Sequence, residues 1–230
     1  MSLFTTFVYG IAVGAYEIFP FNEIKEIKEL ILEGNTLNVF ETPYYLDKIS
    51  FYKSISQSDY DVVFVGDSIT DRSDWHDIFP HLTVANRGIN SDPTEGVLNR
   101  LDTIVDTKAE KAFLMIGIND IGYGIDMDTI FVNYVKIIRA LEKNNITPYV
   151  QSTLFTDGHS SIQKNVKDLN MRLRTFCKKN NIVFIDLNSQ LSKKEKLKNI
   201  YSFDGVHLNG KGYEIWSKIL LKYLSNGYSP

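Results

Sequence analysis

The sequence predicts an α/β fold in which helices cover both faces of a five-stranded parallel sheet, a three-layer α/β/α sandwich. The 230 residues are 43% hydrophobic and 23% charged, close to the averages of globular proteins, so one domain with a sizeable core is expected. From residue 59 onward, short β-rich runs alternate with longer segments of helical periodicity, which is typical of repeated βαβ units. No internal repeat or low-complexity segment interrupts this alternation.

Strands are expected where β-branched and aromatic residues cluster, at 60–65, 82–85, 112–116, 147–151 and 182–186. Helices are expected between and after the strands, at 94–106, 127–143, 160–180 and 210–225. In the second of these helices, apolar side chains recur at helical spacing, namely Ile130, Tyr134, Ile137, Ile138 and Leu141. This stripe indicates that one side of the helix packs against the sheet.

The beginning of the chain has a different pattern. Residues 1–21 contain no Lys or Arg and a single acidic residue, Glu17. We expect an uncleaved membrane anchor there, with membrane association through residues 3–19 and a location at the cell envelope. The alternative is a helix docked on the core of a cytoplasmic protein. Residues 22–58 are expected to form an amphipathic helix and an irregular linker, and residues 59–230 the main domain.

Composition and motifs exclude several classes of ligand. The formal net charge is −3 and no basic block stands out, so no nucleic acid partner is expected. The single cysteine, Cys177, excludes an intramolecular disulfide and a thiolate zinc site. His76, His81 and His159 lack metal-ligand spacing, so no metal site is expected. Neither a phosphate-loop ending nor Gly-x-Gly-x-x-Gly follows a strand, so nucleotide binding is not expected.

Polar segments follow the first three predicted strands. They lie at 66–68, 86–90 and 117–120, and a fourth polar segment at 204–207 precedes the last helix. In an open parallel sheet, ligands bind at the carboxyl ends of the strands. We therefore expect the four segments to meet at one edge of the sheet.

These segments contain the groups that nucleophilic catalysis needs. A serine hydroxyl is a weak nucleophile unless a base removes its proton, and we expect His207 to be that base for Ser68. Asp204 is expected to accept a hydrogen bond from the imidazole Nδ1–H and so to fix its tautomer. The expected donors to an oxyanion are the backbone N–H groups of Ser68 and Gly88 and the side-chain amide of Asn119.

The four segments resemble the four sequence blocks of the SGNH hydrolase superfamily, the GDSL esterases and lipases. The nucleophile, the two further oxyanion-hole positions and the Asp-x-x-His pair of that family fall on Ser68, Gly88, Asn119, Asp204 and His207. The resemblance extends from about residue 61 to residue 208, and it is strongest to the branch of platelet-activating-factor acetylhydrolase and bacterial carbohydrate acetylesterases. It implies a flavodoxin-like sheet, no cofactor, and hydrolysis of small acyl esters.

We therefore expect a serine esterase that hydrolyses short acyl esters, above all O-acetyl esters, of a small molecule or a glycan through an acyl-enzyme. The alternatives are a lysophospholipase or other lipid acyl hydrolase, transfer of the acyl group to another sugar, and a catalytically silent glycan-binding module. A conventional α/β-hydrolase is excluded because Thr70 stands where the Gly-x-Ser-x-Gly elbow requires glycine.

Several side chains near the predicted site have two interpretations. Tyr123 and Phe203 are expected to contact the substrate, with ordinary packing as the alternative. Arg87 is expected either to bind a substrate anion or to form an internal ion pair with an aspartate. Further aromatic residues that flank the predicted catalytic loops are Trp75, Phe79 and Tyr201.

Overall fold

A computed structural model describes residues 39–54 and 59–224. The chain divides into two compact units, Met1–Thr42 and Pro43–Pro230. In the described part of the first unit, Val39–Glu41 form a 3-10 helix, η1. The predicted anchor and the predicted amphipathic helix after it lie outside the described residues. Among the helices that the structure does describe, none combines the length and the apolar character needed to cross a membrane.

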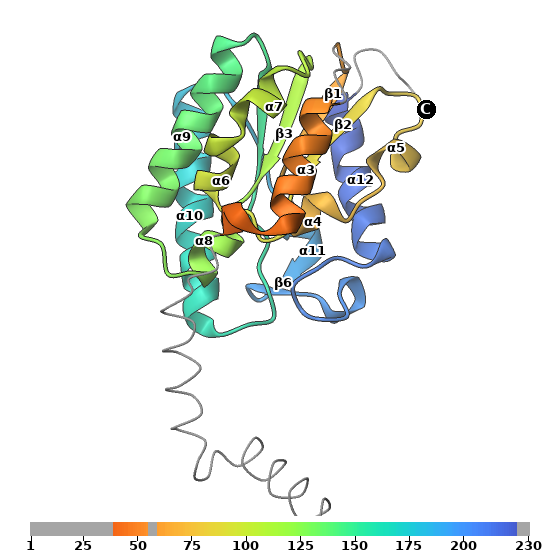
Figure 1. Ribbon diagram of the computed structural model, residues 1–230. Helices are drawn as coiled ribbons and strands as arrows, with labels where there is room; N and C mark the ends of the chain where they lie inside the picture. The colour runs from red at the N-terminus through yellow and green to blue at the C-terminus, as the bar shows by residue number, and fades with distance from the viewer. Residues whose placement is uncertain (1–38, 55–58, 225–230) are drawn as a thin grey trace, which may run out of the picture. The chain divides into compact units, whose positions relative to one another are not determined.

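The centre of the second unit is a parallel sheet flanked by helices (Figure 1). Its strand order is β2-β1-β3-β4-β5. The strands are β1 (Val62–Gly66), β2 (Val84–Gly88), β3 (Lys111–Met115), β4 (Thr147–Gln151) and β5 (Val183–Ile185). All five overlap the predicted runs, and the predicted flavodoxin-like order is confirmed. β1 and β3 are buried along their whole length because helices cover both faces of the sheet.

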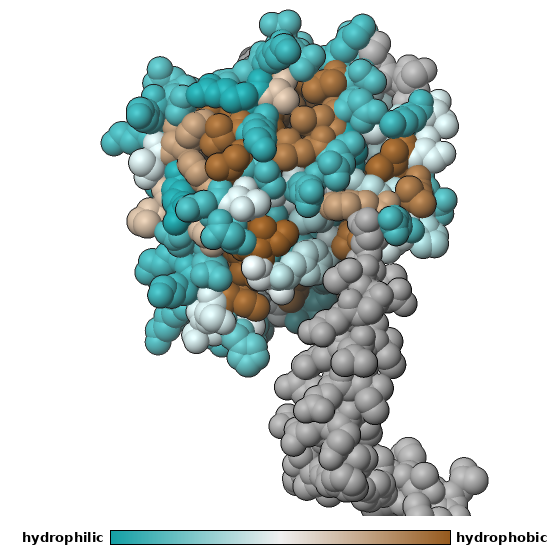
Figure 2. Space-filling model, turned by 60° about the vertical axis from the view of Figure 1, so that its left-hand side comes forward, coloured by the Kyte–Doolittle hydropathy of each residue, from teal (hydrophilic) through white to brown (hydrophobic). Residues whose placement is uncertain are grey.

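Alternate residues of the central strands point to opposite faces of the sheet and enter two separate cores. Val63 and Val65 belong to the core under one helical layer. That layer consists of α6 (Thr94–Asn99), α7 (Leu101–Val105), α9 (Met127–Lys143) and α10 (Ser160–Lys179). The face that Figure 2 shows is mixed, with several hydrophobic patches between hydrophilic side chains. The predicted helix at 127–143 is confirmed as α9. The helix predicted at 94–106 is divided at Arg100 into α6 and α7.

Val62 and Phe64 enter the core on the opposite face. The helices of this layer are α4 (Ser68–Asp71), α5 (Trp75–Ile78), α11 (Asn188–Leu191) and α12 (Gly210–Leu224). The Phe64 ring stacks on Trp75 at 3.8 Å between centroids, and Trp75 meets Trp216 edge to face at 4.8 Å. Trp75 and Phe79 are buried in this core, so they are packing residues.

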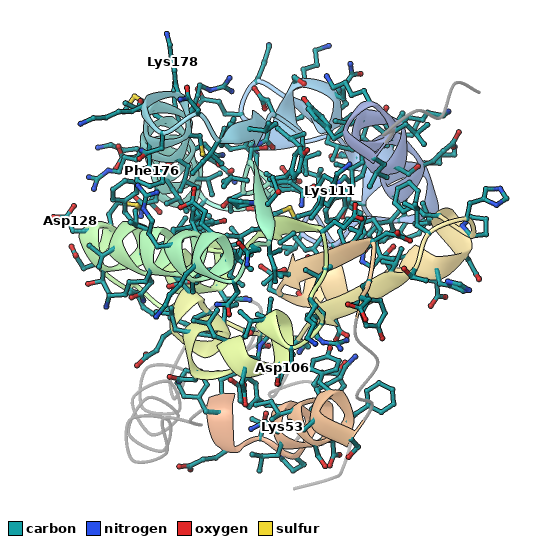
Figure 3. All side chains as sticks on the ribbon, turned by 90° about the horizontal axis from the view of Figure 1, so that it is seen from above. Lys53, Asp106, Lys111, Asp128, Phe176 and Lys178 are labelled. Atoms are coloured by element: carbon teal, nitrogen blue, oxygen red, sulfur yellow. The ribbon has the colours of Figure 1, made fainter. Side chains whose placement is uncertain are left out.

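Two elements differ from the sequence-based expectation. The segment expected to be an irregular linker contains a helix, α3 (Pro43–Ser54), which lies outside α6 and α7 (Figure 3, where Lys53 is labelled on it). Its apolar pattern is weak because its two buried residues, Tyr45 and Tyr52, are amphipathic. A short hairpin of β6 (Ser192–Lys193) and β7 (Lys196–Leu197) follows α11 and precedes η2 (Asn199–Tyr201).

Candidate active site

The turn after β1 presents Ser68 at the carboxyl edge of the sheet. Asp67 is the N-cap of α4, and its side chain accepts a hydrogen bond of 3.0 Å from the Ile69 N–H. Ser68 is the first residue of α4, so its own backbone N–H points out of the helix end without an intrahelical acceptor. The sequence Gly66-Asp67-Ser68 thus places a hydroxyl and an N–H donor on the same residue.

Two glycines allow α4 to lie directly on the ends of β1 and β2. A Cβ atom at Gly66 would stand 2.2 Å from Thr70 Oγ1, and one at Gly88 would stand 2.3 Å from the backbone nitrogen of Asp71. Both distances are too short for any side chain. Glycine is therefore required at these positions for the close approach of the nucleophile-bearing helix.

Side chains from distant parts of the chain hold α4 in place. The Asn86 amide donates to the carbonyl oxygens of Thr70, Asp71 and Ser73 at 3.2, 3.1 and 3.1 Å. The Tyr213 hydroxyl donates to the Ile69 carbonyl at 2.6 Å. A single helical turn has little stability of its own, so these contacts determine where Ser68 lies.

Ser68 and His207 are 139 positions apart in the sequence, and the structure brings both together with Asp204. Ser68 Oγ lies 2.9 Å from His207 Nε2, and His207 Nδ1 lies 2.6 Å from Asp204 Oδ2. The other carboxylate oxygen, Oδ1 of Asp204, accepts the backbone N–H groups of Val206 and His207 at 2.9 and 2.8 Å. The three side chains predicted as a triad therefore form one continuous hydrogen-bonded relay.

Asp204 of the relay and the neighbouring Asp67 have pKa values shifted in opposite directions. Partial burial opposes ionisation of Asp204, but the hydrogen bonds from the His207 ring and from two backbone N–H groups hold the pKa of Asp204 well below its usual range. Full burial raises the pKa of Asp67 to about 7, and the nearby Asp92 and Asp120 add to that effect. Asp204 is thus suited to stabilise an imidazolium, whereas Asp67 serves as a helix cap.

Asn119 lies at the same edge, on the short helix α8 (Ile118–Gly122), which follows Gly117 in a left-handed conformation with φ of 111°. Its side-chain Nδ2 donates a hydrogen bond of 3.0 Å to the Asp92 carbonyl. Because a primary amide carries two hydrogens, the second remains for another acceptor. Asn119 therefore links the loops after β2 and β3 and retains one donor.

Gly88 differs from its predicted role. Its N–H donates to Asn86 Oδ1 at 2.9 Å, and its carbonyl accepts the Tyr52 hydroxyl at 2.7 Å. Both backbone polar groups of Gly88 therefore have internal partners, because this residue is still part of β2 and packs against α4. The structure corrects the assignment of its N–H to an oxyanion hole.

Ser91, three residues later, fits that role better. It occupies a turn closed by the Asp92 N–H and the Ile89 carbonyl at 3.2 Å, with a φ of 64°. Within the described part of the chain, the Ser91 N–H makes no hydrogen bond. Sequence reasoning missed this residue because a serine gives no local signal for a left-handed conformation.

A buried polar network below the site was also missed. Arg100 and Asp92 form an ion pair of 2.8 Å with both side chains fully buried. Arg100 also donates to the Arg87 carbonyl at 2.9 Å and to the Gly66 carbonyl at 3.3 Å. Asp120 accepts the Thr94 N–H at 3.0 Å. These bonds join the ends of β1 and β2 to the loops that carry Ser91 and Asn119.

The remaining candidates fall into two groups. Tyr123 and Phe203 are exposed, and the Phe203 side chain is 95% exposed. Both lie beside site residues. The Tyr123 hydroxyl donates to the Ser91 carbonyl at 3.1 Å, and Phe203 directly precedes Asp204 in the chain. Tyr201 packs against the core. Arg87 is buried, donates to the Thr103 carbonyl at 2.9 Å and lies over the Tyr52 ring at 4.5 Å. Among the described residues, Arg87 therefore binds carbonyl oxygens and an aromatic ring and forms no ion pair with an aspartate.

The three histidines outside the relay, His76, His81 and His159, are exposed. In residues 39–54 and 59–224, no group of three or more His, Cys, Asp or Glu side chains is arranged to hold a metal ion. Cys177 is buried in the core, and burial raises the pKa of its thiol to about 11.

Comparisons with known proteins agree with this geometry. The sequence profile of the GDSL-like lipase/acylhydrolase family matches residues 64–215. Among curated proteins, the N-acylneuraminate cytidylyltransferase of Streptococcus agalactiae serotype V is 27% identical over 120 residues, which are 52% of this chain and 29% of that protein. The chain thus spans less than a third of the length of that relative.

Solved structures with the same fold come from several bacteria. A GDSL-like lipase from Bacteroides thetaiotaomicron has a TM-score of 0.70 at 22% identity, covering 78% of this chain and 96% of its own. A catalytic mutant of an acetylxylan esterase from Geobacillus stearothermophilus has a TM-score of 0.61 at 18% identity, covering 75% and 96%. At these identities, the likeness establishes the fold alone.

Proposed function

The chain belongs to the GDSL-like lipase/acylhydrolase family and is a hydrolase of the SGNH type; we propose that it is a serine esterase that removes short acyl groups, above all acetyl, from a carbohydrate. The observation that carries this proposal is the hydrogen-bonded relay from Ser68 through His207 to Asp204. The same arrangement of hydroxyl, imidazole and carboxylate activates serine nucleophiles on unrelated folds.

In the proposed reaction, Ser68 Oγ forms a bond to the ester carbonyl carbon while its proton passes to His207 Nε2. The imidazolium that results is stabilised by Asp204, which keeps its negative charge. The tetrahedral intermediate then collapses, the bond to the alcohol oxygen breaks, and that oxygen takes the proton from His207. Water attacks the acyl-Ser68 in the same way, and the carboxylic acid leaves.

The negative charge on the carbonyl oxygen needs donors that are already in place. We assign these to the backbone N–H of Ser68, the second hydrogen of the Asn119 amide and the N–H of Ser91. Ser91 replaces Gly88 in this set because the Gly88 N–H is bonded to Asn86. The Asn119–Asp92 bond, at 3.0 Å, supports the assignment because it holds Asn119 beside the turn of Ser91.

The aromatic residues beside the relay favour a carbohydrate ester over a long-chain lipid ester. The exposed rings of Tyr123 and Phe203 offer flat faces on which a sugar can stack. The names of the cytidylyltransferase and of the acetylxylan esterase also refer to sugar substrates.

A panel of esters with increasing acyl length tests this function, with the Ser68→Ala variant as the control. We expect acetyl esters to be hydrolysed fastest, and acetate to be released from O-acetylated glycans by the wild type alone. A preference for long acyl chains or for lysophospholipids would overturn the carbohydrate assignment. If Ser68 does not react with a fluorophosphonate, as measured by mass spectrometry, the chain is a silent binding module and the esterase proposal is wrong.

A further inference from the structure

Helix α3 lies outside the segment that matches the family profile, yet it is joined to the nucleophile turn. Tyr52 is 5% exposed, and its hydroxyl donates to the Gly88 carbonyl at 2.7 Å. Its ring packs under the Arg87 guanidinium at 4.5 Å. Gly88 in turn is in contact with the backbone of α4, so Tyr52 fixes the strand residue on which α4 rests.

A second contact from α3 reaches α4 directly. Lys48 Nζ lies 2.5 Å from Asp71 Oδ1, and the Tyr44 hydroxyl binds the other oxygen of the same carboxylate. Hydrogen bonding to Asp71, together with nearby tyrosines, raises the pKa of Lys48 even though burial acts against it, so this amine keeps its charge. Asp71 is the last residue of α4, and Ser68 is the first. The Lys48 ammonium group thus binds α4 one helical turn away from Ser68.

The same helix carries a matched pair of contacts to elements outside the catalytic edge. The Tyr45 hydroxyl donates to the Gly96 carbonyl of α6 at 3.1 Å. Lys53 Nζ lies 2.9 Å from Asp102 Oδ2 of α7. Each pair therefore consists of one buried tyrosine bonded to a glycine carbonyl and one lysine bonded to an aspartate. The first pair, Tyr52 and Lys48, binds β2 and α4 next to the nucleophile. The second pair, Tyr45 and Lys53, binds α6 and α7.

We propose that Tyr52 and Lys48 are positioning residues for the nucleophile and that α3 is a functional part of the active site. This inference rests on the proposed esterase function. The single turn of α4 cannot keep its place unaided, and a shift of Ser68 changes both the distance of Oγ from His207 Nε2 and the direction of the Ser68 N–H. A misplacement of about 1 Å in a catalytic group can lower turnover by about 10²-fold.

The test compares Tyr52→Phe with Tyr45→Phe, and Lys48→Met with Lys53→Met, in the full chain. We expect Tyr52→Phe and Lys48→Met to lower kcat for an acetyl ester by about tenfold with little change in KM, which is the pattern of an interaction needed in the transition state. Tyr45→Phe and Lys53→Met should keep kcat within about twofold of the wild type. Lys48→Arg, which retains the charge, should restore most of kcat.

Thermal unfolding and hydrogen exchange separate positioning from a general loss of stability. Amide exchange at residues 69–72 should become faster in Tyr52→Phe than in Tyr45→Phe, whatever the fall in Tm. Equal losses of kcat in the two pairs, or unchanged kcat and unchanged exchange at 69–72 in Tyr52→Phe, would overturn the proposal. A wild type without esterase activity would instead refute the proposed function, and the exchange measurement would still decide whether α3 holds α4.

Discussion

The nucleophile turn, residues 66–73, and the acid–base loop, residues 202–208, supply the two halves of the relay and are held in different ways. In the nucleophile turn, α4 is bonded by side chains from β2 and α12, among them Asn86 and Tyr213. The acid–base loop is held mainly by its own residues, through Asp204 Oδ1 and a bridge between Ser202 and Leu208. A backbone bond to a distant loop joins the Asp157 N–H to the Gly205 carbonyl at 2.7 Å.

This difference indicates how substitutions should act. A change in the acid–base loop removes chemistry from a segment that is partly exposed, since the Asp204 side chain is 52% exposed. A change under the nucleophile turn alters packing in a region where Ser68 is 5% exposed. Losses of activity without losses of stability are therefore expected in the loop, and losses of both are expected under the turn.

The largest effect is expected for the residues that exchange the proton. Ser68→Ala and His207→Ala should each lower kcat by about 10⁵–10⁶-fold, because nucleophile and base act as one unit. The double variant should be scarcely slower than either single one. Hydrolysis of p-nitrophenyl acetate, corrected for the spontaneous reaction, measures this. Additive losses would contradict a shared relay.

Asp204→Asn should lower kcat by about 10⁴-fold, because an amide at this position favours the wrong imidazole tautomer. The loss should occur with little change in Tm near neutral pH, where a partly exposed aspartate adds little to stability. The depressed pKa of Asp204 means that its contribution to stability is present above the unfolded pKa near 4 and is lost as the pH falls. Thermal unfolding between pH 3 and pH 7 shows whether the variant lacks this dependence.

Asn119→Ala should lower kcat by about 10²–10³-fold with a smaller change in KM, as expected for the loss of one oxyanion donor. Asn119→Asp, which keeps the shape but cannot donate when ionised, should be similarly impaired. Steady-state kinetics on an acetyl ester give both constants. A rise in KM with unchanged kcat would show that Asn119 binds the substrate and does not stabilise the oxyanion.

Gly88→Ala should lower kcat by about tenfold and reduce the free energy of unfolding by about 1–3 kcal/mol, because the added methyl group displaces α4. Gly122→Ala is the matched control, since a Cβ atom there would have no neighbour within 4 Å. The control should leave kcat unchanged and should not lower Tm. Steady-state kinetics and denaturant unfolding are measured on both variants. The packing role of Gly88 would be refuted if Gly88→Ala and Gly122→Ala had the same kcat and the same free energy of unfolding.

The smallest effect on turnover is expected for Asp67→Asn, which keeps an oxygen to cap α4. The folded-state pKa of about 7 lies above the ordinary value of 3.8, so the native protein holds the extra proton. The contribution of Asp67 to stability is therefore complete below about pH 4 and is lost as the pH rises through about 7. Unfolding midpoints at several pH values should decline less steeply in the variant. An unchanged slope would show that the Asp67 carboxyl does not titrate in this range.

The sequence alone determined the sheet, the three long helices and the three side chains of the relay. Strand and helix periods are local properties, and they located α9 to the residue. The relay side chains were also predictable, because the chemistry limits the residue types and the carboxyl ends of parallel strands share one edge.

Only the tertiary structure decided which backbone groups are free and which segments pack on the site. The Gly88 N–H is bonded to Asn86 and the Ser91 N–H is not, because the turn into the next loop begins only after Gly88. Arg87 and α3 differ from the sequence-based expectation for a related reason. Their partners are carbonyl oxygens and aromatic rings of distant segments, which the local sequence does not indicate. Periodicity records which side chains are apolar, whereas the pairing of polar backbone groups depends on how separate elements meet in space.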